Sequence, residues 1–412
     1  MKRKVPPIRW IYRLSLLTLF LSIAIAAYSL ELFLRLSYST VFVRQIAAKL
    51  TAAFRVDIDP RNRYQVITDL RKQGISAVLQ NNVTAGTRDA ELTPLGGIAD
   101  KVTVACNQGG RPLMYETDEH GFNNPKGLWR PESDIVAVGN SFTLGYCVPS
   151  DINFVALIRR RYPATTNLGM PGQGPVHIVA TLKEYAEFLR PKLVLWFYSD
   201  VTFSELQLEK MNPTLMRYVK SDFSQDLLHR QSEIDSALTR ELEMQVYQSM
   251  NLPAINQDRL FHDLAELLKL SMLRRKLGLI RRATLLRDVG GLSESEVSAF
   301  EYDLNLIRET LSEAKTQVEA WGGALYFVDL PQWERLYALN PDIGVRVHTE
   351  ISKFVEALGI PIIDLYPAFQ DHPDPSSLFP LRGSGHYNRE GHRLVSETVL
   401  NVISKTPGLR QQ

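Results

Sequence analysis

Short apolar segments separated by longer amphipathic ones dominate the chain from residue 134 onward. The apolar segments are residues 134–138 (DIVAV), 192–198 (KLVLWFY), 324–330 (ALYFVDL) and 361–365 (PIIDL), and a weaker strand signal lies at residues 165–168 (TTNL). Continuous apolar runs of this length are typical of strands buried on both faces, and the lengths between them suit helices. The pattern predicts an α/β domain with a parallel sheet. Ligands of such sheets bind beyond the carboxyl ends of the strands, so functional residues are expected directly after these segments.

The polarity of the chain defines three stretches. Residues 1–37 are a basic tip followed by an apolar run, and residues 38–130 are mixed and polar. This second stretch predicts a lead-in region of short elements packed on the main domain. Residues 131–412 form the α/β domain, in which a charge-rich helical insertion at residues 205–320 interrupts the alternation of strands and helices.

Part of the insertion, residues 264–287, combines leucines and basic residues at helical spacing. A basic amphipathic helix can lie on an anionic membrane surface, which would suit an esterase that acts on lipids. The simpler interpretation is a helix with a solvated basic face that packs on its own domain.

The N-terminus has the composition of an export signal. Its first thirteen residues include five cations, namely Lys2, Arg3, Lys4, Arg9 and Arg13. Residues 14–30 carry no charge, and a bilayer helix needs about 20 apolar residues. Apolar residues resume after Glu31, which favours an uncleaved single-pass transmembrane anchor over a cleaved signal peptide. The cations predict a cytoplasmic N-terminus and an extracytoplasmic, periplasmic body.

Composition and charge narrow the function classes. The 412 residues are 45% hydrophobic and 22% charged, which is ordinary for a globular protein and excludes a disordered chain. The formal net charge is +2, and without the N-terminal cations the remainder is slightly acidic, so nucleic acid is not an expected partner. Cys106 and Cys147 are too few for a zinc or iron–sulfur site. A disulfide, which an exported protein permits, and two free thiols remain equally open.

Three polar segments near the ends of the predicted strands carry the candidate chemistry. Residues 139–145 (GNSFTLG) place Ser141 at a turn into a helix, where backbone N–H groups favour negative charge. An acyl-transfer nucleophile needs this setting, although a helix cap is the alternative role. Residues 167–175 (NLGMPGQGP) supply glycines that let a backbone N–H approach a ligand. Residues 385–392 (GHYNREGH) place His386 before a final helix, where an imidazole can act as general base.

In their order and spacing the three segments resemble the SGNH (GDSL-like) hydrolase superfamily, in its membrane-anchored bacterial type, over residues 118–400. The resemblance implies a flavodoxin-like sheet and a serine mechanism through an acyl-enzyme, with no metal or other cofactor. It also implies Ser141 as the nucleophile, the N–H groups of Ser141 and Gly169 as oxyanion donors, and His386 as the base.

Two positions around the nucleophile depart from the family's pattern. Asn140 stands where family members carry an aspartate, a position that is commonly structural. The asparagine of the third block, an oxyanion donor in the family, is absent after the third strand, where the hydroxyls of Ser199 and Thr202 are the candidates to replace it. Loss of one oxyanion donor costs about 2.7–4 kcal/mol, or roughly 10²–10³ in rate.

The base also lacks its usual partner. Gly383 and Ser384 occupy the positions where the family carries the aspartate that orients the histidine. His386 would then depend on Ser384, on a backbone carbonyl, or on a displaced acid such as Asp371 or Asp374. Loss of the orienting acid can cost about 10⁴ in turnover in serine enzymes.

These observations predict a membrane-anchored extracytoplasmic serine esterase or acyltransferase. Its expected partners are the membrane, through the N-terminal helix, and a small-molecule ester or an acylated glycan, such as the O-acyl groups of surface or exported polysaccharide. The alternative hypothesis is a catalytically impaired SGNH-fold module that binds or assembles, which the two incomplete parts of the machinery would suit.

Overall fold

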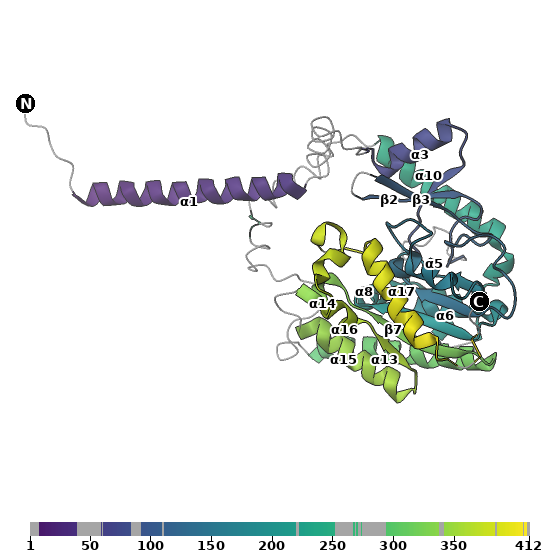
Figure 1. Ribbon diagram of the computed structural model, residues 1–412. Helices are drawn as coiled ribbons and strands as arrows, with labels where there is room; N and C mark the ends of the chain where they lie inside the picture. The colour runs from purple at the N-terminus through teal and green to yellow at the C-terminus, as the bar shows by residue number, and fades with distance from the viewer. Residues whose placement is uncertain are drawn as a thin grey trace, which may run out of the picture. The chain divides into compact units, whose positions relative to one another are not determined.

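The computed structural model of the chain is shown in Figure 1. It describes residues 8–38, 59, 61–83, 92–108, 111–219, 222–251, 267, 269–270, 273, 294–337, 342–383, 385–406 and 408–409. The chain divides into two compact units. One comprises Met1–Pro60 with Asn251–Arg287, and the other comprises Arg61–Met250 with Asp288–Gln412. The candidate site lies in the second unit.

In the first unit, helix α1 (Ile8–Tyr38) covers the segment predicted as an anchor. Among the described residues, no helix is long and apolar enough to cross a bilayer, so the structure does not support the predicted transmembrane anchor. The predicted basic amphipathic segment, residues 264–287, lies almost entirely outside the described residues.

The second unit is built on a parallel sheet of five strands. These are β4 (Ile135–Gly139), β5 (Thr165–Asn167), β6 (Leu193–Ser199), β7 (Ala324–Leu330) and β8 (Ile362–Asp364). Their order in the sheet is β5-β4-β6-β7-β8, the 2-1-3-4-5 order of flavodoxin-like folds. All five predicted segments are therefore strands, and the predicted flavodoxin-like sheet is confirmed.

Helices cover both faces of this sheet. The α-helices described outside α1 are α3 (Arg63–Lys72), α4 (Ser141–Leu144), α5 (Phe154–Arg159), α6 (Pro175–Thr181), α7 (Glu187–Leu189), α8 (Thr202–Glu209), α9 (Pro213–Met216), α10 (Gln231–Asn251), α13 (Glu294–Ala320), α14 (Trp333–Tyr337), α15 (Asp342–Ala357), α16 (Tyr366–Gln370) and α17 (Arg389–Ile403). Ile135 and Ala137 of β4 join a core cluster with residues of α5 and α17. The alternate residues Val136 and Val138 are equally buried, on the face where α6 and α13 contact each other and the sheet. Burial on both sides explains the continuous apolar runs.

The lead-in region contains a second sheet that the sequence did not predict. Its strands are β1 (Ala77–Leu79), β2 (Val102–Gln108) and β3 (Arg111–Glu116). β1 runs parallel to β2, and β3 is antiparallel to it. β1 is only three residues long, and only one of the six residues of β3 is buried, so neither produces a clear apolar signal.

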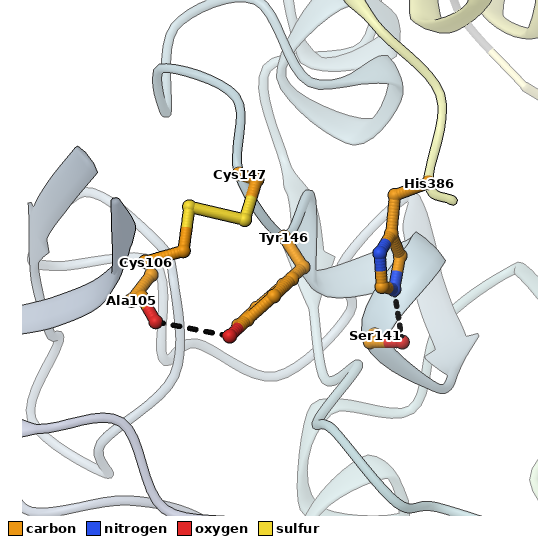
Figure 2. Close-up of a disulfide and its surroundings, with 6 residues drawn as sticks. All are labelled: Ala105, Cys106, Ser141, Tyr146, Cys147 and His386. Atoms are coloured by element: carbon orange, nitrogen blue, oxygen red, sulfur yellow. Dashed lines mark hydrogen bonds between the residues drawn. A yellow bond between two sulfur atoms is a disulfide. The ribbon is translucent and has the colours of Figure 1, made fainter. Parts of the chain in front are cut away.

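A disulfide joins this smaller sheet to the α/β body. Cys106 of β2 is bonded to Cys147, which follows α4, so the first of the two alternatives for the cysteines holds. Beside it, the hydroxyl of Tyr146 donates a hydrogen bond of 3.1 Å to the backbone carbonyl of Ala105, as Figure 2 shows. β2 is therefore linked twice to the segment that follows the nucleophile candidate.

Candidate active site

The turn between β4 and α4 fixes the position of Ser141. Gly139, the last residue of β4, has a φ of +147°. A Cβ atom there would lie 2.4 Å from Oγ1 of Thr143 and 2.6 Å from the carbonyl oxygen of Phe197. The turn therefore requires glycine, both for its backbone conformation and for the close approach of β6. Ser141 is the first residue of α4, and its side chain is partly accessible.

His386 reaches Ser141 from the other end of the chain. Its Nε2 lies 2.7 Å from Oγ of Ser141, although the two residues are 245 positions apart in sequence (Figure 2). The imidazole packs against the ring of Phe142, with centroids 4.7 Å apart, and against the ring of Tyr146 at 5.0 Å. The distance suits a nucleophile and its general base. The two residues predicted as catalytic thus lie together.

Neighbouring residues hold the loop that carries His386. The hydroxyl of Tyr387, a buried residue, donates a hydrogen bond of 2.6 Å to the carbonyl of Pro331, just beyond β7. Asn388 caps α17 by accepting from the N–H groups of Glu390 and Gly391. Packing and a helix cap thus bring the loop to the edge of the sheet where Ser141 lies.

The environment of the imidazole of His386 favours its neutral form. Burial lowers the pKa of His386 to about 4, because the charged form loses hydration. No carboxylate among the described residues accepts a hydrogen bond from its Nδ1. Asp374 is instead bonded to Arg382 at 2.6 Å, and Asp371 is exposed. Ser384 lies outside the described residues, so its predicted role stays a prediction.

Two backbone N–H groups were predicted as oxyanion donors. The N–H of Ser141 donates to no other group in the described part of the chain. Gly169 lies beside α4, where an added Cβ would be 2.6 Å from Cβ of Thr143. Its N–H, however, donates to the side-chain oxygen of Asn167 at 2.9 Å. Gly169 would have to release Asn167 before it could stabilise an oxyanion.

The two hydroxyls predicted to replace the missing asparagine are both buried. Ser199 has no accessible surface, and its Oγ accepts a hydrogen bond of 2.7 Å from Nδ2 of Asn140. A substrate oxygen therefore has no surface of Ser199 to contact in this conformation. Thr202, the first residue of α8, is 2% exposed. Asn140 itself caps α4 through its Oδ1, so it has a structural role, as expected.

Sequence reasoning missed two acids of α8 that lie close to this turn. Oε2 of Glu205 is 3.4 Å from Nδ2 of Asn140. Burial and the nearby charge of Glu209 raise the pKa of Glu205 to about 8. Glu209 itself is buried and accepts hydrogen bonds from the N–H groups of Val176 and His177 at the start of α6. The sequence signal was a pair of acids four residues apart just after the third strand.

A buried network of ion pairs links residues near the carboxyl ends of β6 and β7. Arg335 of α14 bonds to Asp200, which follows β6, at 2.7 Å, and to Asp329 of β7 at 2.9 Å. Nε2 of His348 lies 2.8 Å from Asp329. Asp200, the residue after Ser199, is thus paired with a guanidinium.

Comparisons with known proteins found matches only among solved structures. No family model and no curated protein sequence matches the chain. Among solved structures, a G-D-S-L family lipolytic protein from Veillonella parvula matches with a TM-score of 0.34 and 13% identity, over 66% of this chain and 98% of that chain. A lipase/acylhydrolase from Enterococcus faecalis matches with a TM-score of 0.36 and 14% identity, over 68% and 100%. An acetylxylan esterase from Geobacillus stearothermophilus matches with a TM-score of 0.35 and 11% identity, over 67% and 96%.

Proposed function

We propose that this chain is an SGNH-type serine ester hydrolase or acyltransferase. The observation that carries the proposal is the hydrogen bond of 2.7 Å between Oγ of Ser141 and Nε2 of His386, at the carboxyl end of a parallel sheet. His386 takes the proton of Ser141 as its Oγ attacks the acyl carbonyl, and the N–H of Ser141 faces the developing oxyanion. The alcohol leaves with the proton, and an acyl-enzyme remains. Water or an acceptor hydroxyl then attacks the acyl-enzyme and gives its proton to His386. The bond between the acyl carbon and Oγ of Ser141 breaks, and His386 returns the proton to Oγ.

The test is labelling by a fluorophosphonate, whose phosphorus bonds to the serine oxygen as fluoride leaves. We expect the wild-type protein to be labelled and the Ser141→Ala variant to remain unlabelled. Wild-type protein that resists the probe would overturn the proposal, as would labelling of equal extent in the Ser141→Ala variant.

The acid side of the pH profile follows from the environment of His386. Catalysis requires the neutral imidazole, and burial lowers its pKa to about 4. Protonation therefore removes the base only as the pH falls through that value. We expect the labelling rate to be level from about pH 6 down to pH 5 and to fall by tenfold per unit well below pH 4. A decline centred near pH 6.5, the usual value for histidine, would contradict this environment.

We also propose that the substrate is an O-acyl group on a surface or exported polysaccharide and that the body acts outside the cytoplasm. The disulfide between Cys106 and Cys147 supports this location, because such bonds persist in oxidising compartments. The apolar stretch behind the N-terminal cations is the sequence's candidate for export or anchoring. Acetate released from O-acetylated polysaccharide by wild-type protein, but not by the Ser141→Ala variant, would support the substrate class. Hydrolysis confined to simple esters would argue against it.

The second candidate function is a binding or assembly module with impaired catalysis. Two observations favour it: Nδ1 of His386 meets no carboxylate among the described residues, and the N–H of Gly169 is occupied by Asn167. Binding of an acylated glycan that persists in Ser141→Ala and His386→Ala proteins, together with no ester turnover by the wild type, would establish this function. Turnover that depends on Ser141 would exclude it.

A further inference from the structure

Glu205 lies beside residues 139–141, the nucleophile turn between β4 and α4. The proposed serine mechanism gives this glutamate no role. It lies on α8, which begins three residues after β6, at the edge of the sheet where ligands bind. The side chain is half-buried, and its Oε2 is 3.4 Å from Nδ2 of Asn140, the residue before Ser141. Within the described part of the chain, no group forms a hydrogen bond with the other oxygen, Oε1.

Asn140 settles which oxygen of Glu205 can carry a proton. Its Oδ1 accepts from the N–H of Phe142 at 3.1 Å, so the atom that faces Glu205 and Ser199 is the amide nitrogen. An amide nitrogen donates and does not accept. Oε2 of Glu205 is therefore the accepting oxygen, and a proton on the carboxyl group belongs on Oε1. An aspartate at position 140 would instead set two carboxylates side by side.

The charges around Glu205 favour the protonated acid. Glu209 follows one turn later on α8, and its carboxylate is held by His177 of α6. Burial and this nearby carboxylate raise the pKa of Glu205 to about 8, so the group is neutral at pH 7. Among the described residues, no cation forms an ion pair with it.

The other charged groups near α8 already have partners. Asp200, just before α8, bonds to Arg335 of α14. Asp303 of α13 accepts from Gln207 and from Lys210. His386, across the turn, is neutral above about pH 4. The two cations among them, Arg335 and Lys210, are already paired with carboxylates, so neither favours ionisation of Glu205.

We propose that Glu205 is a catalytic hydrogen-bond donor, whose protonated carboxyl stabilises the oxyanion through Oε1–H in place of the amide that the third block usually supplies. The inference rests on the proposed serine mechanism. Apart from the N–H of Ser141, the predicted donors are committed or buried, since the N–H of Gly169 bonds to Asn167 and Ser199 has no accessible surface. A neutral carboxylic acid in a partly buried site is a strong donor to a developing negative charge.

The experiment follows the rate of fluorophosphonate labelling from pH 3 to pH 10 in wild type and in Glu205→Gln and Glu205→Ala variants. The wild-type rate is expected to fall as the pH rises through about 8, because the ionised carboxylate loses its proton and repels the oxyanion. The glutamine variant keeps an N–H donor and has no group to ionise, so its rate stays level above pH 8. The alanine variant loses about 10²–10³ in rate at neutral pH. All three keep the same acid limb, which belongs to His386.

A matched control is Glu187→Gln, which changes an exposed acid of α7 and should reproduce the wild-type profile. Thermal unfolding establishes that each variant is folded. The proposal is overturned if folded Glu205→Gln protein keeps the wild-type alkaline limb or is as slow as Glu205→Ala, or if Glu205→Ala labels at the wild-type rate. In these cases labelling of Ser141 still stands. Wild-type protein that is not labelled at Ser141 instead overturns the serine mechanism, and this inference with it.

Discussion

The nucleophile turn and the base loop meet in one site but are held in different ways. The turn is fixed by its backbone: Gly139 has a φ of +147° and no room for a Cβ, and Asn140 caps the helix that starts at Ser141. The base loop is fixed around His386 rather than at it, through the hydroxyl of Tyr387 and the flanking rings. The position of Ser141 therefore depends on local conformation, and the position of His386 depends on tertiary packing.

Removal of the base should have the largest effect. His386→Ala takes away the group that accepts the proton of Ser141, and we expect the labelling rate to fall by about 10²–10⁴. The control is His229→Ala, which removes an exposed histidine and should leave the rate unchanged. A His386→Ala protein that labels as fast as wild type would show that the packed imidazole is not the base.

Removal of the disulfide should destabilise both the turn that carries Ser141 and the loop that carries His386. We expect Cys106→Ser with Cys147→Ser to lower the free energy of unfolding by about 2–5 kcal/mol, measured by urea titration. A reductant should destabilise the wild-type protein to a similar extent and leave the double variant unaffected. Equal stability of the two oxidised proteins would contradict a structural role for the link between β2 and the segment after α4.

A Cβ at the turn should disable the nucleophile more than it destabilises the fold. Gly139→Ala forces a strained backbone, which costs about 1–3 kcal/mol, and pushes the turn away from Phe197. Gly127→Ala is the matched control, because Gly127 also has a positive φ but an added Cβ there meets nothing within 4 Å. Both variants should melt at lower temperature, but only Gly139→Ala should lose labelling. Normal labelling of Gly139→Ala protein would show that the turn tolerates a shift.

The smallest expected effect concerns the support of the base loop. Tyr387→Phe leaves the carbonyl of Pro331 without its donor, and we expect a loss of about 1 kcal/mol in unfolding free energy with a labelling rate reduced less than tenfold. Tyr162→Phe is the control, since its buried hydroxyl has no partner among the described residues. It should cost nothing. A larger loss from Tyr162→Phe than from Tyr387→Phe would refute the role given to the loop contact.

The difference between local conformation and tertiary packing also explains which features could be predicted from the sequence. Four of the five strands were predicted because burial on both faces leaves continuous apolar runs, as in residues 193–199, whereas the polar β5 left only a weak signal. Ser141 and His386 were predicted because their motifs are local. The lead-in sheet was missed because β1 is short and β3 is mostly not buried. Glu205 was missed because its environment arises only when α8 folds against Asn140, which lies 65 residues away in sequence.

The disulfide and the hydrogen bond that link β2 to the segment after Ser141 also determine where the chain can be shortened. A shortened protein that begins at residue 131 would retain the whole parallel sheet and both motif residues. It would lack Ala105 and Cys106, the tethers of Tyr146 and Cys147, and Tyr146 is one of the rings against which His386 packs. The smallest fragment that keeps these contacts therefore starts upstream of β2, and the polarity change at residue 130 is not a safe place for truncation.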